Sequence, residues 1–440
     1  MTSQTTTETT FQVGSLTYNK RALVRLFSWL LLGDFAMSMM GVALSKLLPL
    51  QLDSMGVPAG QIGTILSLGP LATLVLSPFI GVWSDRLRTK WGRRRPFLLI
   101  STPILAIGLL LIPHISNIWF LAVVILIVQV CNVLETVLLY LYADIIPPQL
   151  LGRFMASIRV VGITGALTFQ YFLLPQFGTS PVMVWTVTAI IYIVFYQLSL
   201  HMVREGSYPP PTPETSKQLV KDYVKDGFTS KYIWLLWFCM GSVALATPAS
   251  YFIDIFSKKE LGLDMKEIAH MNFISTLPAL FLMFPGGWIM DRFGPRVIWG
   301  LFTFLIGASF LATFLFAHDA ASMRWFYFAT GVFSPLMMLG LMPMLYAHLP
   351  AAKFGQLTST QSLVVHGFIF VSANVLGYLI QAQNSYRIAL LYAAPFFLLT
   401  PLFVFLLSKA KSPFAHLPTA LATKKQREAE EKEAALCSVN

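Results

Sequence analysis

The chain has 440 residues, of which 56% are hydrophobic and only 12% are charged, and its mean hydropathy is +0.67. Soluble domains carry about 25% charged residues, so this composition excludes an ordinary soluble protein and indicates a chain that lies in a lipid bilayer. The net charge of +11 is then expected to set membrane topology rather than to bind nucleic acid.

The N-terminal segment, residues 1–25, is polar and rich in threonine, and it lacks the pattern of a signal peptide. A membrane-spanning helix needs about 20 consecutive apolar residues. Twelve stretches are candidates, at residues 26–50, 61–83, 97–113, 117–143, 154–177, 181–202, 232–256, 268–290, 297–317, 322–346, 355–381 and 385–408. The sequence therefore predicts an all-α integral membrane protein with twelve transmembrane helices.

A polar segment at residues 203–231 interrupts this series with a proline cluster and many charges. Such composition is typical of a linker, and residues 215–226 within it are predicted to form a short amphipathic helix. The linker divides the chain into two six-helix bundles, at residues 26–202 and 232–408. Residues 409–440 form a charged tail.

Lysine and arginine are distributed unevenly over the loops. If the N-terminus is cytoplasmic, 24 of the 31 Lys and Arg residues lie on the cytoplasmic side, 5 lie on the opposite side, and Lys46 and Arg159 lie inside helices. The positive-inside rule then predicts that both termini, the linker and the loop at residues 84–96 are cytoplasmic.

The two halves also repeat each other. The segment Gly81–Arg86 (GVWSDR) is matched by Gly287–Arg292 (GWIMDR), and Tyr142–Asp144 is matched by Tyr346–His348. These and further matches follow in the same order at offsets of 203 to 208 positions. A doubled six-helix unit predicts pseudo-symmetric bundles with a substrate site near the midplane between them.

A twelve-helix chain in two halves, with a GxxxDR loop after helix 2 and its copy after helix 8, resembles the major facilitator superfamily. Residues 47–97, which end in SDRLRTKWGRRRPF, resemble the corresponding stretch of the sucrose and glycoside cation symporters. The resemblance implies a transporter that works by alternating access.

The resemblance also implies a gate at the GxxxDR loop. Gly81, Asp85, Arg86, Asp144 and Arg153 are expected to form a charge network that holds the cytoplasmic side closed. The second copy keeps Gly287, Asp291 and Arg292 but has His348 and Gln356 in place of Asp144 and Arg153, which predicts a weaker network there. Residues 93–95, three arginines, are expected to anchor the loop at phospholipid headgroups instead.

Charged residues inside helices give the candidate transport site. A charge at mid-helix costs about 2.5–3.5 kcal/mol on insertion scales, so it usually faces the bundle interior and has a partner. At 1.5 Å per residue, Asp34 and Glu135 lie about 12 Å from the cytoplasmic helix ends and Arg159 about 8 Å. These three groups are expected to meet and to couple substrate binding to a proton. The alternatives are a static Glu135–Arg159 ion pair, or an Asp34 that faces water near the inner mouth.

Other polar and aromatic residues are weaker candidates for contact with a sugar in the cavity. Snorkelling toward the outer interface explains Lys46 and Asp254, and Gly162 and Gly165 are expected to let two helices pack closely. The weaker candidates are Asn132, Tyr140, Trp237, Asp254 and His366.

No nucleophile, phosphate-binding or metal-binding motif appears, so the sequence predicts neither an enzyme nor a cofactor. The predicted function is import of a sugar or glycoside with a proton or a sodium ion, by a monomer in the plasma membrane, or the inner membrane of a bacterium. The alternatives are a proton-coupled exporter of drugs or metabolites and a non-transporting assembly factor on the same scaffold. Membrane lipids are expected partners, and nucleic acid is not.

Overall fold

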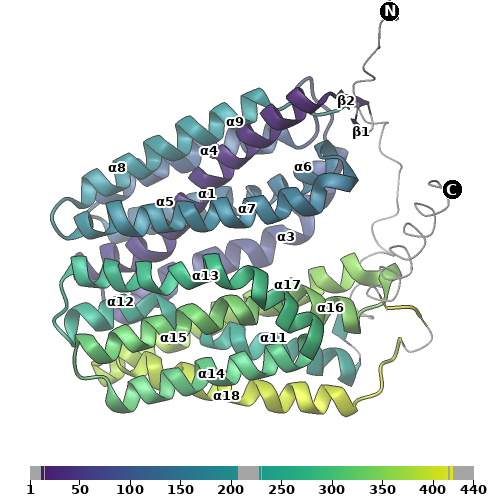
Figure 1. Ribbon diagram of the computed structural model, residues 1–440. Coiled ribbons are helices and arrows are strands. Elements are labelled where there is room, and N and C mark those ends of the chain that lie inside the picture. Colours follow the sequence, from purple (N-terminus) through teal and green to yellow (C-terminus); the bar gives the residue numbers. More distant parts are fainter. Residues whose placement is uncertain (1–10, 14, 207–226, 229, 415–416, 420–440) are drawn as a thin grey trace, which may run out of the picture. The chain divides into compact units, whose positions relative to one another are not determined.

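The computed structural model describes residues 11–13, 15–206, 227–228, 230–414 and 417–419, with the side chains of residues 81, 82, 85, 283 and 284 left out. The predicted helix at 215–226 and the end of the C-terminal tail therefore lie outside the described residues. The described chain is almost entirely helical, and it divides into two compact units (Figure 1). The first unit comprises Met1–Pro213 and Gly262–Thr276, and the second comprises Glu214–Leu261 and Leu277–Asn440.

The first unit contains a small hairpin followed by the six predicted spans, several of which are built from two or three consecutive helices. The elements are β1 (Phe11–Val13), β2 (Leu16–Tyr18), α1 (Lys20–Ser54), α2 (Ala59–Leu66), α3 (Leu68–Arg86), α4 (Arg95–Leu111), η1 (Ile112–His114), α5 (Ile118–Leu134), α6 (Val137–Ile145), α7 (Pro148–Thr168), η2 (Phe169–Leu173), η3 (Leu174–Gly178), α8 (Pro181–Ile191), η4 (Tyr192–Tyr196) and α9 (Gln197–Met202).

The second half of the chain repeats this plan. Its elements are α11 (Lys231–Ala246), α12 (Ala249–Lys259), α13 (Met265–Phe293), α14 (Pro295–Phe316), α15 (Ala320–Leu339), α16 (Leu341–His348), η5 (Ala351–Lys353), α17 (Phe354–Gln383) and α18 (Ile388–Lys409). Within the second unit α14 and α18 lie side by side (Figure 1).

Among the described residues, eleven segments are long and apolar enough to cross a membrane. A twelfth is α13, which bends by 64° between Leu282 and Pro285. Large apolar side chains cover the outside of the bundles: Trp119 is 76% exposed and Phe316 is 70% exposed. Since such a surface is stable only in lipid, the predicted all-α membrane fold is confirmed.

Polar caps and prolines set where the helices begin. The Asn19 side chain accepts the Ala22 N–H and Asn117 caps α5, while Asp319 and Ser322 form a capping box before α15. Proline stands in the first turn of α4, α7, α8 and α14, where its missing N–H costs nothing. These signals fix the loop ends from which the functional side chains project.

Two spans break at equivalent places. The fourth span breaks at Glu135 and Thr136, between α5 and α6, and the tenth breaks at Gly340, between α15 and α16, 204 positions after Thr136. The breaks therefore belong to the repeated design. The repeat differs there in chemistry, because the first half places a carboxyl at its break and the second half places a glycine.

Helices α1 and α7 approach closely because of two glycines. A Cβ atom on Gly165 would lie 2.6 Å from the backbone oxygen of Phe35, and one on Gly162 would lie 2.9 Å from Ser38 Oγ and 3.2 Å from Asp34 Oδ2. The predicted tight packing at these glycines is confirmed for this helix pair.

The β1–β2 hairpin was not predicted, because residues 1–25 read as a polar tail. Its two three-residue strands pair antiparallel, with Phe11 opposite Tyr18 and Val13 opposite Leu16. The alternation of Phe11, Val13, Leu16 and Tyr18 with polar residues is the signal that this interpretation passed over.

We predict that Gly165→Ala lowers the melting temperature of the purified protein by several degrees, because the new methyl group meets backbone that cannot move aside cheaply. Gly41→Ala on the same α1 helix is the matched control, since a Cβ there meets nothing within 4 Å. The measurement is thermal unfolding in detergent. Equal stability of the two variants would contradict the close α1–α7 contact.

Candidate functional site

A charge network lies at the loop between the second and third spans. Asp144 lies near the end of α6. The Arg93 guanidinium donates a hydrogen bond to its carboxylate at 2.8 Å, and the Arg94 side chain donates to the same carboxylate. Their side chains are only 9–16% exposed. Asp144 therefore takes part in a charge network, but its partners are two of the arginines expected to anchor lipid rather than Arg86 or Arg153.

Glu205, which follows the sixth span, completes this network and was missed by the sequence analysis. Its carboxylate accepts hydrogen bonds from the backbone N–H groups of Arg94 at 3.0 Å and Arg95 at 3.2 Å, at the N-terminus of α4. Gly92 makes room: its φ is +107°, and a Cβ on it would lie 2.2 Å from Glu205 Oε2. The sequence did offer one signal for Glu205, because this carboxylate stands directly after a predicted helix end and beside Arg204.

The other residues of the predicted gate are less engaged. Gly81 and Asp85 lie in α3, but their side chains lie outside the described part of the structure. Arg86 and Arg153 are exposed, and neither forms an ion pair within the described residues. The described network thus links the loop after helix 2, helix 4 and the end of helix 6.

The second half has a different contact at the equivalent place. Arg296 and His348 follow Arg94 and Asp144 by 202 and 204 positions. Arg296 Nε donates to His348 Nε2 at 2.9 Å, and His348 Nδ1 lies 2.7 Å from the Met344 carbonyl oxygen. Because a guanidinium only donates, His348 Nε2 carries no proton and the imidazole is neutral.

The copied GxxxDR residues lie at the surface of this half. Asp291 and Arg292 are exposed, and the Arg292 guanidinium lies over the Trp288 ring at 5.4 Å. A Cβ on Gly287 would meet nothing within 4 Å. The described residues of this half therefore hold no counterpart of the Arg–Asp ion pairs in the first.

Asp34 on α1 and Arg159 on α7 lie close enough for their charges to interact, but no ion pair joins them among the described residues. Asp34 is 8% exposed, and Gly162, one turn after Arg159, allows its carboxyl to lie against α7. The Arg159 charge acts on the Asp34 carboxyl, and the Arg159 side chain is itself exposed. A nearly buried carboxylate beside an accessible cation is an arrangement that can bind a polar substrate.

Glu135 lies in a separate buried cluster. It is 0% exposed, and Ser101 Oγ on α4 donates to Glu135 Oε1 at 2.7 Å. The hydroxyls of Tyr192 and Tyr196, whose rings stack at 5.3 Å on η4, interact with the same carboxyl. Glu135 Oε2 and both tyrosine hydroxyls have no partner of hydrogen-bond geometry among the described residues.

The expected meeting of three charges is therefore corrected. No ion pair joins Glu135 to Arg159 in the described residues, because the break in the fourth span turns Glu135 toward α4 and η4. Tyr142 connects the two places: it is 1% exposed, and its hydroxyl interacts electrostatically with both Asp34 and Glu135.

The weaker candidates are distributed over both units. Asn132 donates to Gln129 at 3.5 Å, and Tyr140 lies under the Arg94 guanidinium at 5.0 Å. Trp237 is 1% exposed, and its indole N–H donates to the Gly227 carbonyl at 2.9 Å, so it packs in the interior.

Asp254 and His366 lie in the second half. Asp254 does not snorkel: it is buried and accepts the Tyr327 hydroxyl at 2.5 Å. His366 is half-buried, with Nδ1 2.8 Å from the Ser362 carbonyl oxygen. In the part of the chain that the structure describes, no group of three His, Cys, Asp or Glu side chains is arranged to hold a metal ion.

We predict that Asp144→Asn destabilises the protein more than Arg93→Gln does. The first change leaves two partly buried guanidinium groups without their carboxylate, whereas the second leaves the Arg94–Asp144 contact in place. Lys90→Gln, at an exposed position of the same loop, is the control. The measurement is thermal unfolding in detergent, and an Arg93→Gln loss as large as that of Asp144→Asn would contradict the shared-carboxylate arrangement.

Comparison with known proteins identifies the family. The model of the family described as "MFS/sugar transport protein" matches residues 30–377, which is more than half of the chain. The sucrose transport protein SUC3 of Arabidopsis thaliana is 36% identical over 78 residues, and an uncharacterised symporter of Synechocystis is 38% identical over 68 residues. These alignments cover 18% and 15% of this chain but only 13% and 12% of the relatives.

Solved structures agree on the fold. The nucleoside transporter NupG superposes with a TM-score of 0.70 at 14% identity, covering 88% of this chain and all of that one. A bacterial homologue of the iron transporter ferroportin gives a TM-score of 0.68 at 14% identity, covering 88% of this chain and all of the other. The chain is thus an integral membrane transporter, and it belongs to the MFS/sugar transport protein family of the major facilitator superfamily.

Proposed function

We propose that the protein is a proton-coupled symporter that carries a sugar or glycoside across the plasma membrane by alternating access. The local similarity to sucrose transport proteins supports a sugar as substrate. The excess of Lys and Arg in the loops assigned to one side supports cytoplasmic termini. The working unit in this proposal is the single chain.

The observation that carries the proposal is the electrostatic interaction of the buried Asp34 carboxyl with Arg159 on the facing helix. A carboxylate 8% exposed in a membrane bundle is costly unless a cation or a proton neutralises it. Sugar hydroxyls are good partners for both a carboxylate and a guanidinium. When a sugar engages Arg159, Asp34 loses part of its compensation and binds a proton instead, so sugar and proton occupancy rise together.

Glu135 is the second proton-binding group in this proposal. It is sealed from the outside, so it is suited to hold a proton rather than a sugar. Ser101 and the tyrosines around it supply hydroxyls that stabilise either protonation state. Tyr142 lies within electrostatic reach of both carboxyls, and its buried hydroxyl has no hydrogen-bond partner among the described residues.

The network of Arg93, Arg94, Asp144 and Glu205 acts as the cytoplasmic latch. Charge-assisted hydrogen bonds at partly buried sites contribute about 1.5–3 kcal/mol each. Several of them bias a two-state equilibrium strongly while remaining breakable in each transport cycle. We assign the second half a lesser part in this latch, because a neutral His348 replaces the carboxylate there.

The experiment is uptake of labelled sucrose and other disaccharides into proteoliposomes with and without an inward proton gradient. We expect Asp34→Asn to abolish accumulation against the sugar gradient, because an amide cannot take up and release the proton. Asp319→Asn is the matched control: it makes the same chemical change at an exposed helix cap, where asparagine caps equally well. Gradient-independent uptake by the wild type would remove proton coupling from the proposal, and gradient-driven expulsion would make the protein an exporter.

We predict that Glu135→Gln also abolishes uphill accumulation while exchange of labelled for unlabelled sugar across the membrane continues. Exchange needs only the loaded carrier to reorient, whereas accumulation needs proton binding and release. Ser101→Ala is the companion variant: it removes one hydrogen bond to Glu135 but keeps the carboxyl, so it should lower the rate without uncoupling. Unchanged accumulation by Glu135→Gln would remove Glu135 from the coupling.

A further inference from the structure

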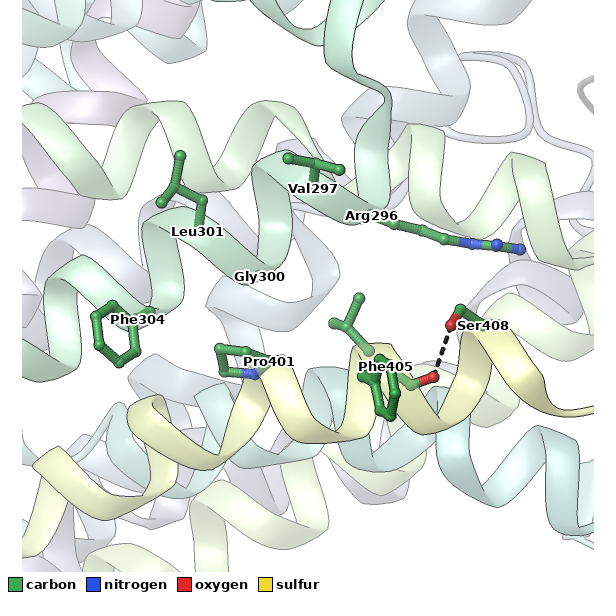
Figure 2. Close-up of a pocket in the computed structure, with 9 residues that line it drawn as sticks. Arg296, Val297, Gly300, Leu301, Phe304, Pro401, Phe405 and Ser408 are labelled. Carbon is green, nitrogen blue, oxygen red and sulfur yellow. Dashed lines mark hydrogen bonds between the residues drawn. The ribbon is translucent and has the colours of Figure 1, made fainter.

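A membrane-facing groove lies between α14 and α18 in the second unit. It has a volume of about 530 Å³, and its walls are formed by Val297, Leu301 and Phe304 on one helix and Pro401 and Phe405 on the other (Figure 2). Four of these side chains are about half exposed (Val297, Leu301, Phe304 and Phe405). The groove is therefore an apolar hollow on the surface that faces lipid.

Gly300, which has no side chain, keeps the hollow open. A Cβ on Gly300 would reach Pro401 and Val404 only at about 3.9 Å, so the space above Gly300 is unfilled. From Arg296 to Phe304 the groove follows α14 for about 12 Å at 1.5 Å per residue, which is most of one leaflet's hydrocarbon depth of about 15 Å. An acyl chain fits this length and this polarity.

Positive charge gathers at one end of the groove. Figure 2 shows Arg296 and Ser408 at that end, where the Ser408 hydroxyl donates to the Phe405 carbonyl at 2.7 Å. The Lys409 ammonium lies 4.4 Å from the centre of the Phe405 ring, so a second cation stands beside the groove. In the described residues Asp291, the nearest acid in sequence, makes no ion pair with Arg296.

Among the described residues no carboxylate pairs with Arg296, because the two halves have diverged at this place. In the first half Asp144 neutralises the equivalent arginine, whereas in the second the partner is neutral His348. His348 fixes the guanidinium through Nε, and in the part of the chain that the structure describes the two terminal nitrogens remain available for another acceptor. A fixed guanidinium at the end of an acyl-sized groove is the arrangement that recognises a phosphodiester.

We propose that this groove binds one anionic phospholipid, with an acyl chain between α14 and α18 and the headgroup phosphate on Arg296 and Lys409. The site lies in the second unit alone and is independent of the transport site. Its occupant is a bilayer lipid, because the groove opens to the hydrocarbon rather than to water.

The test is native mass spectrometry of the full-length protein with phosphatidylglycerol and phosphatidylcholine of identical acyl chains. We expect the wild type to retain phosphatidylglycerol at least about fivefold better, which is the effect of the Arg296 cation alone near an anionic headgroup. Arg296→Gln should remove this preference, and His348→Asp should reduce it by supplying the missing carboxylate. Gly300→Leu should lower retention of both lipids by filling the groove. Arg324→Gln, at an exposed cation on α15, should change nothing.

If Arg296→Gln fails to fold, Gly300→Leu and His348→Asp decide the question, because neither removes the arginine. Equal retention of the two lipids by the wild type would overturn the proposal. Retention of phosphatidylglycerol by Gly300→Leu at the wild-type level would overturn it equally, since the lipid would then bind elsewhere.

Discussion

The cost of burying charge in a membrane governs this molecule. Every ionised side chain inside the bundles must find a partner, take up a proton or reach water. Asp34 lies against α7 within reach of the Arg159 charge, Ser101 donates to Glu135, and Tyr327 donates to Asp254. A group that is stable only while a mobile partner is present responds to that partner, and this is the physical basis of coupling in a carrier.

The internal repeat shows how a shared scaffold diverges. Both halves place an arginine near the start of one helix and a partner at the end of another, but Asp144 in the first half is His348 in the second. Both halves break the equivalent span, but the first half alone has a carboxyl at the break. Among the described residues the Arg–Asp ion pairs thus lie in the first unit, while the second unit has an arginine whose partner is a neutral histidine.

Much of the architecture could be predicted from the sequence, because apolar runs of about 20 residues have few alternatives to a membrane helix. The repeated GxxxDR motif likewise indicated the superfamily. The partners of individual side chains were harder to predict from the sequence. Glu205 follows a helix end, but its partners could not be predicted from that position, because its role depends on Gly92, which is more than 100 residues away. Glu135 and Arg159 are separated because the helix breaks at Glu135, and a hydropathy profile does not reveal such a break. The prediction that they meet used only their depth along the helices, which does not give the direction in which a side chain points.

The central claim is that sugar movement carries a proton through the Asp34–Arg159 site. A neutral sugar accompanied by a proton moves net charge, so the most direct measurement is current on a solid-supported membrane after a sucrose concentration jump. We predict an inward positive current for the wild type and none for Asp34→Asn. Transport of labelled sucrose by the wild type without any current would contradict this claim.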